Sequence, residues 1–181
     1  GHLISMISEH HAVLDPLQQL QREGFRITLL TPQPDGLLNR EELEAAITED
    51  TQLISVMLAN NEIGVIQPLP EIAALCRAHG VTLHSDAAQA FGQIPLDTKL
   101  VGADLLSLSA HKLNGPKGVG ALICNPDLTV EPLQWGGGQE QGLRPGTLPV
   151  PLIIGFAKAA ELAQSDLASR SQRIERLRNR L

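Results

Sequence analysis

Short apolar stretches alternate with helical patterns along most of this chain, and this alternation limits the folds that it can adopt. We expect strands at residues 3–7, 25–30, 53–59, 81–84, 104–109 and 120–124. Helical patterns separate them at residues 13–22, 40–47 and 71–79, and a long one follows residue 153. Strand–helix–strand repetition at this spacing predicts an α/β protein with a mostly parallel sheet flanked by helices.

Composition narrows the class of protein further. Hydrophobic residues make up 43% of the chain and charged residues 19%, as expected of a protein with a packed core. The net charge of -6 offers no electrostatic reason to expect nucleic-acid binding. No apolar run approaches the roughly 20 residues needed to cross a bilayer. We therefore expect neither a nucleic-acid nor a membrane partner.

Cys76 and Cys124 are the chain's two cysteines. Neither lies beside another cysteine or in a spacing that suits a metal site. The simplest interpretation is a pair of buried free thiols in a reducing compartment, which favours a cytoplasmic protein without a metal.

Polar residues follow several of the expected strands. Asn61, Asp86 and Lys112 each come just after one of them. In open α/β sheets, ligands bind beyond the carboxyl ends of the strands. These side chains are therefore candidates for a shared binding crevice.

Lys112 and Asp86 have complementary chemistry. A lysine that ends a buried strand is unfavourable unless it is paired or loses its charge, and a Schiff base with an aldehyde cofactor achieves the second. Asp86 could keep the pyridinium nitrogen of pyridoxal 5′-phosphate (PLP) protonated, and Gln89 could donate to the phenolic oxygen of the ring. The alternatives are a surface lysine in a loop, and an aspartate that caps a helix starting at Ala87. Because the two residues end successive strands, PLP binding accounts for both together.

Four motifs occur in a fixed order: NNEIG at 60–64, HSDAAQ at 84–89, SAHKLNGPKGVG at 109–120 and GGGQEQGLRPGT at 136–147. With them the chain closely resembles cysteine desulfurases of the NifS/IscS type, in the class V aminotransferase superfamily of fold-type I PLP enzymes. The resemblance covers nearly the whole chain. It implies a truncated PLP-binding large domain at residues 1–150, followed at 151–181 by a helical segment leading toward an absent small domain.

The resemblance also implies an activity. The parent enzyme would convert L-cysteine to L-alanine and pass the sulfur to an enzyme persulfide, then to a scaffold or carrier protein for iron–sulfur cluster assembly. The nucleophilic cysteine and an upstream phosphate loop of the family are expected outside this chain, so the chain alone should be inactive. A selenocysteine lyase, an aminotransferase, or a non-catalytic domain that retains the fold are the alternatives.

Site residues follow from the resemblance one by one. Lys112 would be the catalytic Schiff-base lysine, and His10 would stack on the ring and move protons. Without the resemblance, the better interpretation of His10 is a polar residue that opens a helix. The remaining cofactor contacts implied are Asp86, Gln89, Asn61, Ser109, His111 and Thr147. Thr147 would reach the phosphate across a homodimer interface. Pro145 replaces a serine common in that loop.

Overall fold

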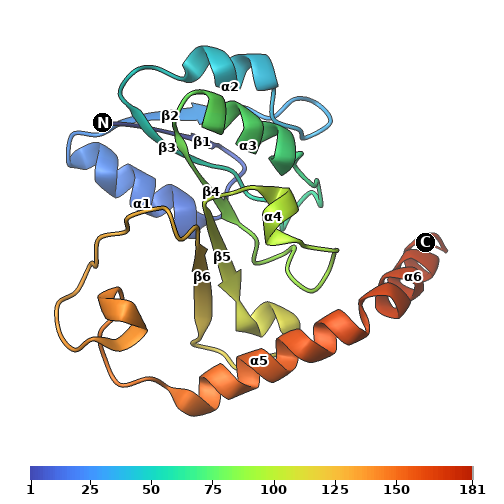
Figure 1. Cartoon of the computed structure of the whole chain (residues 1–181). Coiled ribbons are helices and arrows are strands. Elements are labelled where there is room, and N and C mark those ends of the chain that lie inside the picture. The colour runs from blue at the N-terminus through green and yellow to red at the C-terminus, as the bar shows by residue number, and fades with distance from the viewer. Residues whose placement is uncertain (181) are drawn as a thin grey trace.

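One six-stranded sheet lies at the centre of the computed structural model, which describes residues 1–180 (Figure 1). The spatial order of the strands is β2-β1-β3-β4-β5-β6. Their bounds are β1 His2–Met6, β2 Arg26–Leu30, β3 Thr51–Ser55, β4 Thr82–Asp86, β5 Leu105–Ser109 and β6 Gly120–Cys124. Neighbouring strands from β2 to β5 pair in parallel, and this confirms the expected α/β architecture.

Strand β6 is the exception, because it runs antiparallel to β5. The connection between them, residues 110–119, contains only the short 3-10 helix η1, Ala110–Leu113. A parallel neighbour would need a crossover of about a dozen residues or more, so this shorter connection returns the chain in the opposite direction.

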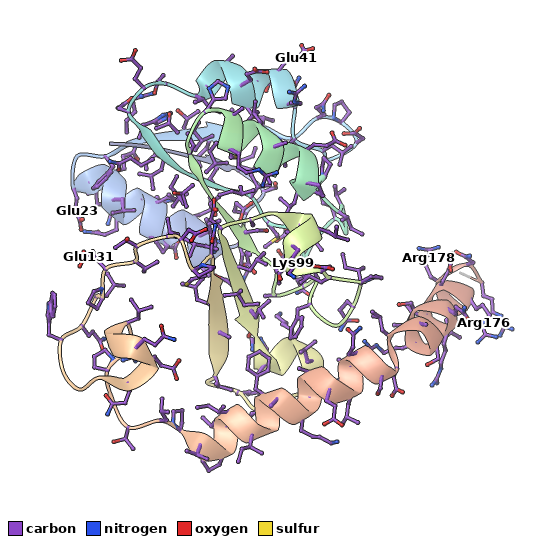
Figure 2. The ribbon with its side chains drawn as sticks, viewed as in Figure 1. Glu23, Glu41, Lys99, Glu131, Arg176 and Arg178 are labelled. Carbon is purple, nitrogen blue, oxygen red and sulfur yellow. The ribbon has the colours of Figure 1, made fainter. Side chains whose placement is uncertain are left out.

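Helices cover both faces of the sheet. Figure 1 shows α2 and α3 on one face, α1 on the other, and α5 running past the lower ends of β5 and β6. The α-helices are α1 His11–Arg22, α2 Arg40–Ala46, α3 Leu69–Ala78, α4 Thr98–Val101, α5 Val150–Ser165 and α6 Leu167–Arg178, and a second 3-10 helix, η2, spans Gln139–Gly142. Charged side chains such as Glu41 on α2 and Arg178 on α6 project outward from this framework (Figure 2). None of the helices in residues 1–180 combines the length and apolar composition needed to span a membrane.

Local signals in the sequence explain where these helices begin and end. The side chain of Asn39 accepts hydrogen bonds from the backbone N–H groups of Glu41 and Glu42, and so caps α2 as its sequence predicts. Helix α3 begins at Leu69 rather than at the expected residue 71, because a proline is compatible with the first turn of a helix. Gly80 follows its last turn with a φ of +66°.

The main core lies between the sheet and helices α2 and α3. The side chains of Ile54, Leu83, Leu43 and Leu69 are completely buried there. Burying one such side chain contributes about 1.5–3 kcal/mol. A second, smaller cluster joins α5 to η1 through Leu113, Ala159 and Ala163. Phe91 and Phe156 pack against it and contact each other edge to face.

The third strand is shorter than its apolar pattern predicts. Residues 56–59 stay buried, but the regular strand ends at Ser55. Beyond it the chain still follows β4, since Val56 N–H donates to the carbonyl of His84 and Leu58 N–H to that of Asp86. The buried segment therefore continues past the regular strand toward the carboxyl edge of the sheet.

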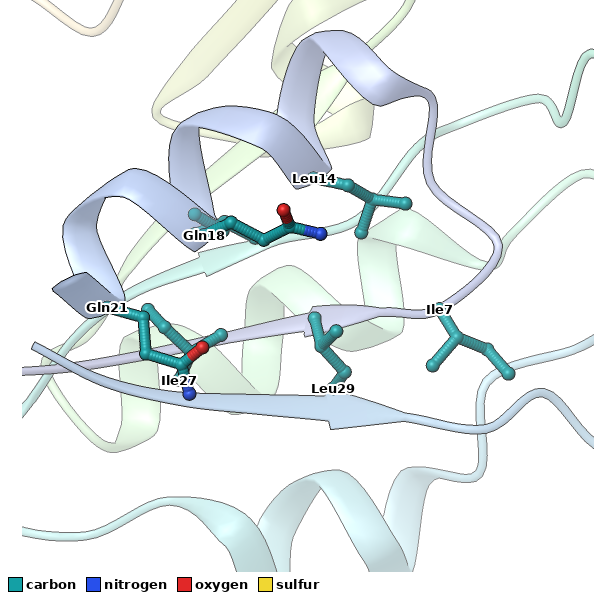
Figure 3. Close-up of a pocket in the computed structure, with 7 residues that line it drawn as sticks. Ile7, Leu14, Gln18, Gln21, Ile27 and Leu29 are labelled. Atoms are coloured by element: carbon teal, nitrogen blue, oxygen red, sulfur yellow. The ribbon is translucent and has the colours of Figure 1, made fainter.

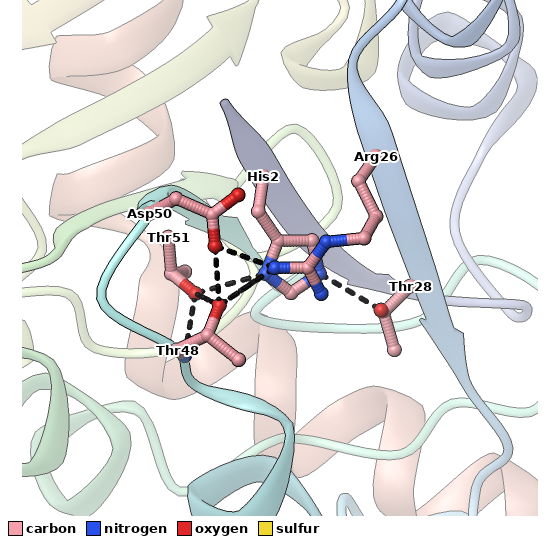
Figure 4. Close-up of polar contacts among 6 residues, drawn as sticks. All are labelled: His2, Arg26, Thr28, Thr48, Asp50 and Thr51. Carbon is pink, nitrogen blue, oxygen red and sulfur yellow. Dashed lines mark hydrogen bonds and ion pairs between the residues drawn. The ribbon is translucent and has the colours of Figure 1, made fainter.

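A buried histidine ties together the opposite, amino-terminal edge of the sheet (Figure 4). The Nδ1 of His2 lies 2.8 Å from Thr51 Oγ1, and its Nε2 lies 2.8 Å from Thr28 Oγ1. Arg26 and Asp50 form an ion pair of 2.6 Å beside them. Burial, reinforced by Arg26, lowers the pKa of His2, so its neutral ring bridges three neighbouring strands.

Gly92 lies where the chain after β4 packs against η1 and α5. Its φ is +71°, and a Cβ atom there would lie 2.5 Å from Leu113 Cδ2 and 2.9 Å from Ala163 Cβ. Gly80 has a similar φ of +66° but open space around it.

We expect Gly80→Ala to lower the free energy of unfolding by about 1 kcal/mol through backbone strain alone. Gly92→Ala should cost about 1–3 kcal/mol more because it also overpacks this contact. Urea denaturation of both variants measures the difference, and equal losses would contradict the packing argument.

Candidate functional site

The candidate site is built from the carboxyl ends of four neighbouring strands. Strands β1, β3, β4 and β5 are adjacent in the sheet in that order and run parallel. The chain continues from these ends to His10, Asn61, Asp86 and Lys112 respectively. The tertiary structure therefore gathers at one edge residues that are about 100 positions apart in sequence, as the strand pattern predicts.

Asp86 is the best-defined side chain of this edge. It is the last residue of β4, is 9% exposed, and its Oδ1 accepts a hydrogen bond of 2.8 Å from Ala88 N–H. The chain after it forms turns rather than a helix, so the alternative of a cap for a helix starting at Ala87 is wrong. Its Oδ2 makes no hydrogen bond within residues 1–180. This oxygen can accept from a protonated ring nitrogen, which is the chemistry that a PLP site needs.

His84 lies two positions before Asp86 in β4 and joins this strand to both of its neighbours. Its Nδ1 lies 2.8 Å from Ser55 Oγ on β3, and its Nε2 lies 2.8 Å from Ser107 Oγ on β5. Burial lowers the pKa of His84, against the opposing effect of Asp86, so the ring bridges the three strands in its neutral form. The sequence interpretation missed this role. The available signal was the spacing of two from Asp86, which places both side chains on one face of a strand.

Glu9 is a second functional candidate that the sequence interpretation missed. It follows β1, is only 7% exposed, and its Oε1 accepts a hydrogen bond of 2.6 Å from Met57 N–H. Its Oε2 is buried without a partner in residues 1–180. Burial raises the pKa of Glu9 to about 7, and the nearby Asp86 carboxylate adds to this effect. The site therefore contains a carboxyl group that changes protonation near neutral pH.

Lys112 lies in η1, directly after β5. Ala110 and Leu113 on either side of it are buried and fix this turn against α5, whereas the Lys112 side chain is exposed. The argument that burial destabilises its charge therefore does not hold in this structure. Ser109 and His111 contact each other, with Oγ and Nδ1 2.8 Å apart. Together they offer a hydroxyl and an imidazole on the same turn as the lysine.

The remaining predicted residues differ in how well the structure places them. His10 is exposed and caps α1, because its Nδ1 accepts a hydrogen bond of 3.1 Å from Ala12 N–H. Asn61 is exposed, and Gln89 is half-buried in the turn after Asp86. Thr147 is exposed in the loop between β6 and α5 and makes no side-chain hydrogen bond within residues 1–180. Its expected contact across a homodimer interface stays a prediction.

Neither cysteine belongs to this edge. Cys76 is buried in α3, and burial, with a smaller effect of Asp104, raises its pKa to about 11. Cys124 ends the antiparallel strand β6 and pairs with Leu105 at the start of β5, at the opposite edge from Lys112. Within residues 1–180, no group of three His, Cys, Asp or Glu side chains is placed to hold a metal ion.

A groove of about 310 Å³ lies elsewhere, between α1 and the first two strands of the sheet (Figure 3). Its lining consists of aliphatic side chains and two glutamines: Ile7, Leu14, Leu17, Gln18, Gln21, Ile27 and Leu29. It contains no titratable side chain, so it offers no group for acid–base or nucleophilic chemistry.

The sheet order and the strand-end site define an α/β protein that matches the large domain of PLP enzymes. A structure described as a NifS-like protein superposes with a TM-score of 0.95 and 39% identity, over 99% of this chain and 50% of that chain. The chain belongs to the aminotransferase class-V family, whose model matches residues 1–181.

Two further relatives are more specific. The cysteine desulfurase IscS of Rickettsia africae (strain ESF-5) is 50% identical over 182 residues, which cover 99% of this chain and 44% of that protein. The structure of SspA in complex with cysteine has a TM-score of 0.86 and 44% identity, over 89% of this chain and 47% of that one. The chain thus spans about half the length of the relatives that it matches.

The raised pKa of Glu9 gives this chain a distinctive dependence of stability on pH. Between the unfolded pKa of 4.5 and the folded value of about 7, the folded chain holds a proton that the unfolded chain releases. The free energy of unfolding should therefore fall as pH rises through this range. Glu9→Gln cannot release this proton and so lacks the loss. The free energy of unfolding of Glu9→Gln minus that of the wild type should therefore increase by at most about 3 kcal/mol between pH 4.5 and pH 8. Chemical denaturation at several pH values measures this change. The exposed Glu49→Gln is the control, and a Glu9→Gln curve parallel to wild type would contradict the prediction.

Proposed function

We propose that this chain is the PLP-binding part of a cysteine desulfurase, which converts L-cysteine to L-alanine and transfers the sulfur to an enzyme persulfide. The observation that carries the proposal is the placement of Asp86 and Lys112 at the carboxyl ends of the neighbouring parallel strands β4 and β5. A buried carboxylate with a free oxygen and an accessible lysine at adjacent strand ends suit the two ends of the PLP ring system. The identity to IscS and the cysteine complex of the SspA structure support the choice of substrate.

Each candidate side chain has a proposed role toward the cofactor. Lys112 would bind it through Nζ, Asp86 would pair with the ring nitrogen, and Gln89 would donate to the phenolic oxygen. His10 would lie on the ring from the end of β1. The other proposed contacts are Asn61 near the cofactor or substrate, Ser109 and His111 at the phosphate, and Thr147 at the phosphate of the partner subunit in a homodimer.

PLP, when bound, supplies an electron sink for the bonds around the substrate Cα. Asp86 contributes by stabilising the positive charge on the ring nitrogen, since a buried carboxylate favours the protonated form of a neighbouring base. Lys112 would hold the cofactor through Nζ, and as a free amine this Nζ would accept the proton from the substrate Cα as a general base. His10 is exposed at the same edge, where its imidazole would lie beside the cofactor and the substrate.

Sulfur transfer needs a nucleophilic thiolate. Cys76 is buried with a raised pKa, and Cys124 lies at the opposite edge of the sheet. A thiol needs to be ionised and accessible to react, so neither can accept the sulfur from this site. We propose that another cysteine of the complete enzyme forms the persulfide. From there the sulfur would pass to a scaffold or carrier protein for iron–sulfur cluster assembly in the cytoplasm.

Cofactor binding can be tested with two lysines of the same loop. Lys112 and Lys117 are both exposed, but only Lys112 is proposed to bond to PLP. Addition of PLP should produce the visible absorbance band of a lysine-bound cofactor in the wild type and in Lys117→Ala, and Lys112→Ala should abolish it. A band that persists in Lys112→Ala, or that is lost equally in both variants, would refute the assignment of Lys112.

The position of the cysteines generates a separate expectation for activity. This chain with PLP should release no more sulfide from L-cysteine than PLP alone does, because neither thiol reaches Lys112. A methylene-blue assay for sulfide measures this release. Sulfide production that exceeds the PLP background and is lost on Cys124→Ser would show that this thiol does reach the site.

A further inference from the structure

We propose that Glu9 is a positioning residue of this site, which holds His10 in place by fastening the start of α1 to the end of β3. This inference rests on the proposed function, because that function is what the site would perform. The attachment itself is a property of the chain without cofactor, and it can be tested in that state.

Two hydrogen bonds fasten the segment before α1 to the chain that follows β3. Glu9 Oε1 accepts from Met57 N–H at 2.6 Å, and Asn60 Nδ2 donates to the carbonyl of Ser8 at 2.7 Å. Both bonds therefore run from donors in residues 57–60 to acceptors in residues 8–9. His10 follows immediately, in an extended conformation with φ of -68° and ψ of 151°, as the N-cap of α1. The position of its ring depends on where this segment is held.

The burial of Glu9 has a cost that a purely structural hydrogen bond would not require. A carboxyl group that is 7% exposed leaves Oε2 without a partner, and a buried unsatisfied oxygen destabilises a fold. An amide or a hydroxyl could accept from Met57 N–H with less desolvation. The Asp86 carboxylate lies close enough to affect the Glu9 carboxyl, which places this attachment beside the candidate site.

Protonation removes the charge of the buried Glu9 carboxyl, which lowers the cost of its burial although Oε2 has no partner within residues 1–180. With a pKa of about 7, Glu9 carries a proton in much of the population near neutral pH, and a protonated carboxyl has a donor as well as acceptors. Glutamine has the same shape, with an oxygen for Met57 N–H and a permanent N–H donor. Glu9→Gln should therefore preserve the attachment, and Glu9→Ala should abolish it.

Gln67 offers a matched control. It is 6% exposed, its Oε1 accepts from Leu38 N–H at 2.9 Å, and its Nε2 donates to the carbonyl of Gly36 at 2.9 Å. Like Glu9, it is a buried side chain that fastens a loop to a neighbouring segment, but its side-chain partners are Leu38 and Gly36 rather than residues 57–60. The bond from its backbone N–H to the Leu58 carbonyl does not involve the side chain, so Gln67→Ala leaves it in place. Gln67→Ala should destabilise the fold without affecting His10.

The experiment is NMR spectroscopy of the chain without PLP, in the wild type and in Glu9→Ala, Glu9→Gln and Gln67→Ala. In Glu9→Ala we expect amide exchange of Met57 about tenfold faster than in the wild type, as for the loss of one hydrogen bond. We also expect shifted or broadened ring 15N resonances of His10. Glu9→Gln and Gln67→Ala should leave both signals near wild type. The proposal is overturned if Glu9→Ala leaves His10 unchanged, or if Gln67→Ala disturbs His10 to the same extent.

A PLP titration separates this inference from the proposed function. Glu9→Ala should weaken PLP binding relative to Gln67→Ala, and Glu9→Gln should restore it. If the wild type itself forms no visible band with PLP, the proposed function fails, and the NMR result alone decides whether Glu9 positions His10. If PLP binds and the affinities of Glu9→Ala and Gln67→Ala are equal, the positioning role fails while the proposed function stands.

Discussion

The parallel hydrogen-bond ladder through β1, β3, β4 and β5 is the constraint on which the rest of this structure depends. Parallel neighbours cannot be joined by tight turns, so each crossover places a helix on one face of the sheet, and all carboxyl ends meet at one edge. The loops at that edge contain Glu9, Asp86 and Lys112. A site assembled in this way needs no local sequence cluster. It needs the strands to pair in the observed order.

Burial sets the protonation of the polar groups within this ladder. It raises the pKa of Glu9 and lowers the pKa of His2 and His84, because removal from water disfavours the charged form of each. The two histidines each bridge hydroxyl groups on the strands at either side, one near each edge of the sheet. Neutral rings thereby satisfy polar groups across the sheet without bringing charge into it. The buried carboxyl of Glu9 has no equivalent compensation, because its Oε2 has no partner within residues 1–180.

Much of the site could be predicted because strand ends and residue chemistry are both local properties. Asp86 and Lys112 follow successive apolar runs, and parallel pairing of those runs makes them neighbours. Other features depend on contacts that no local pattern reports. The exposure of Lys112 results from the packing of η1 against α5, and the burial of Glu9 results from its contact with Met57, 48 positions along the chain.

The sequence by itself determined the alternation of strands and helices, the parallel class of sheet and the residue types at its carboxyl edge, because periodicity and polarity are encoded residue by residue. Only the tertiary structure decided the antiparallel direction of β6, the turn in place of a helix after Asp86, and the hydrogen bond that fastens Glu9 to Met57. These features depend on which distant segments come into contact, and burial and hydrogen bonding between such segments become defined only when the whole sheet has assembled.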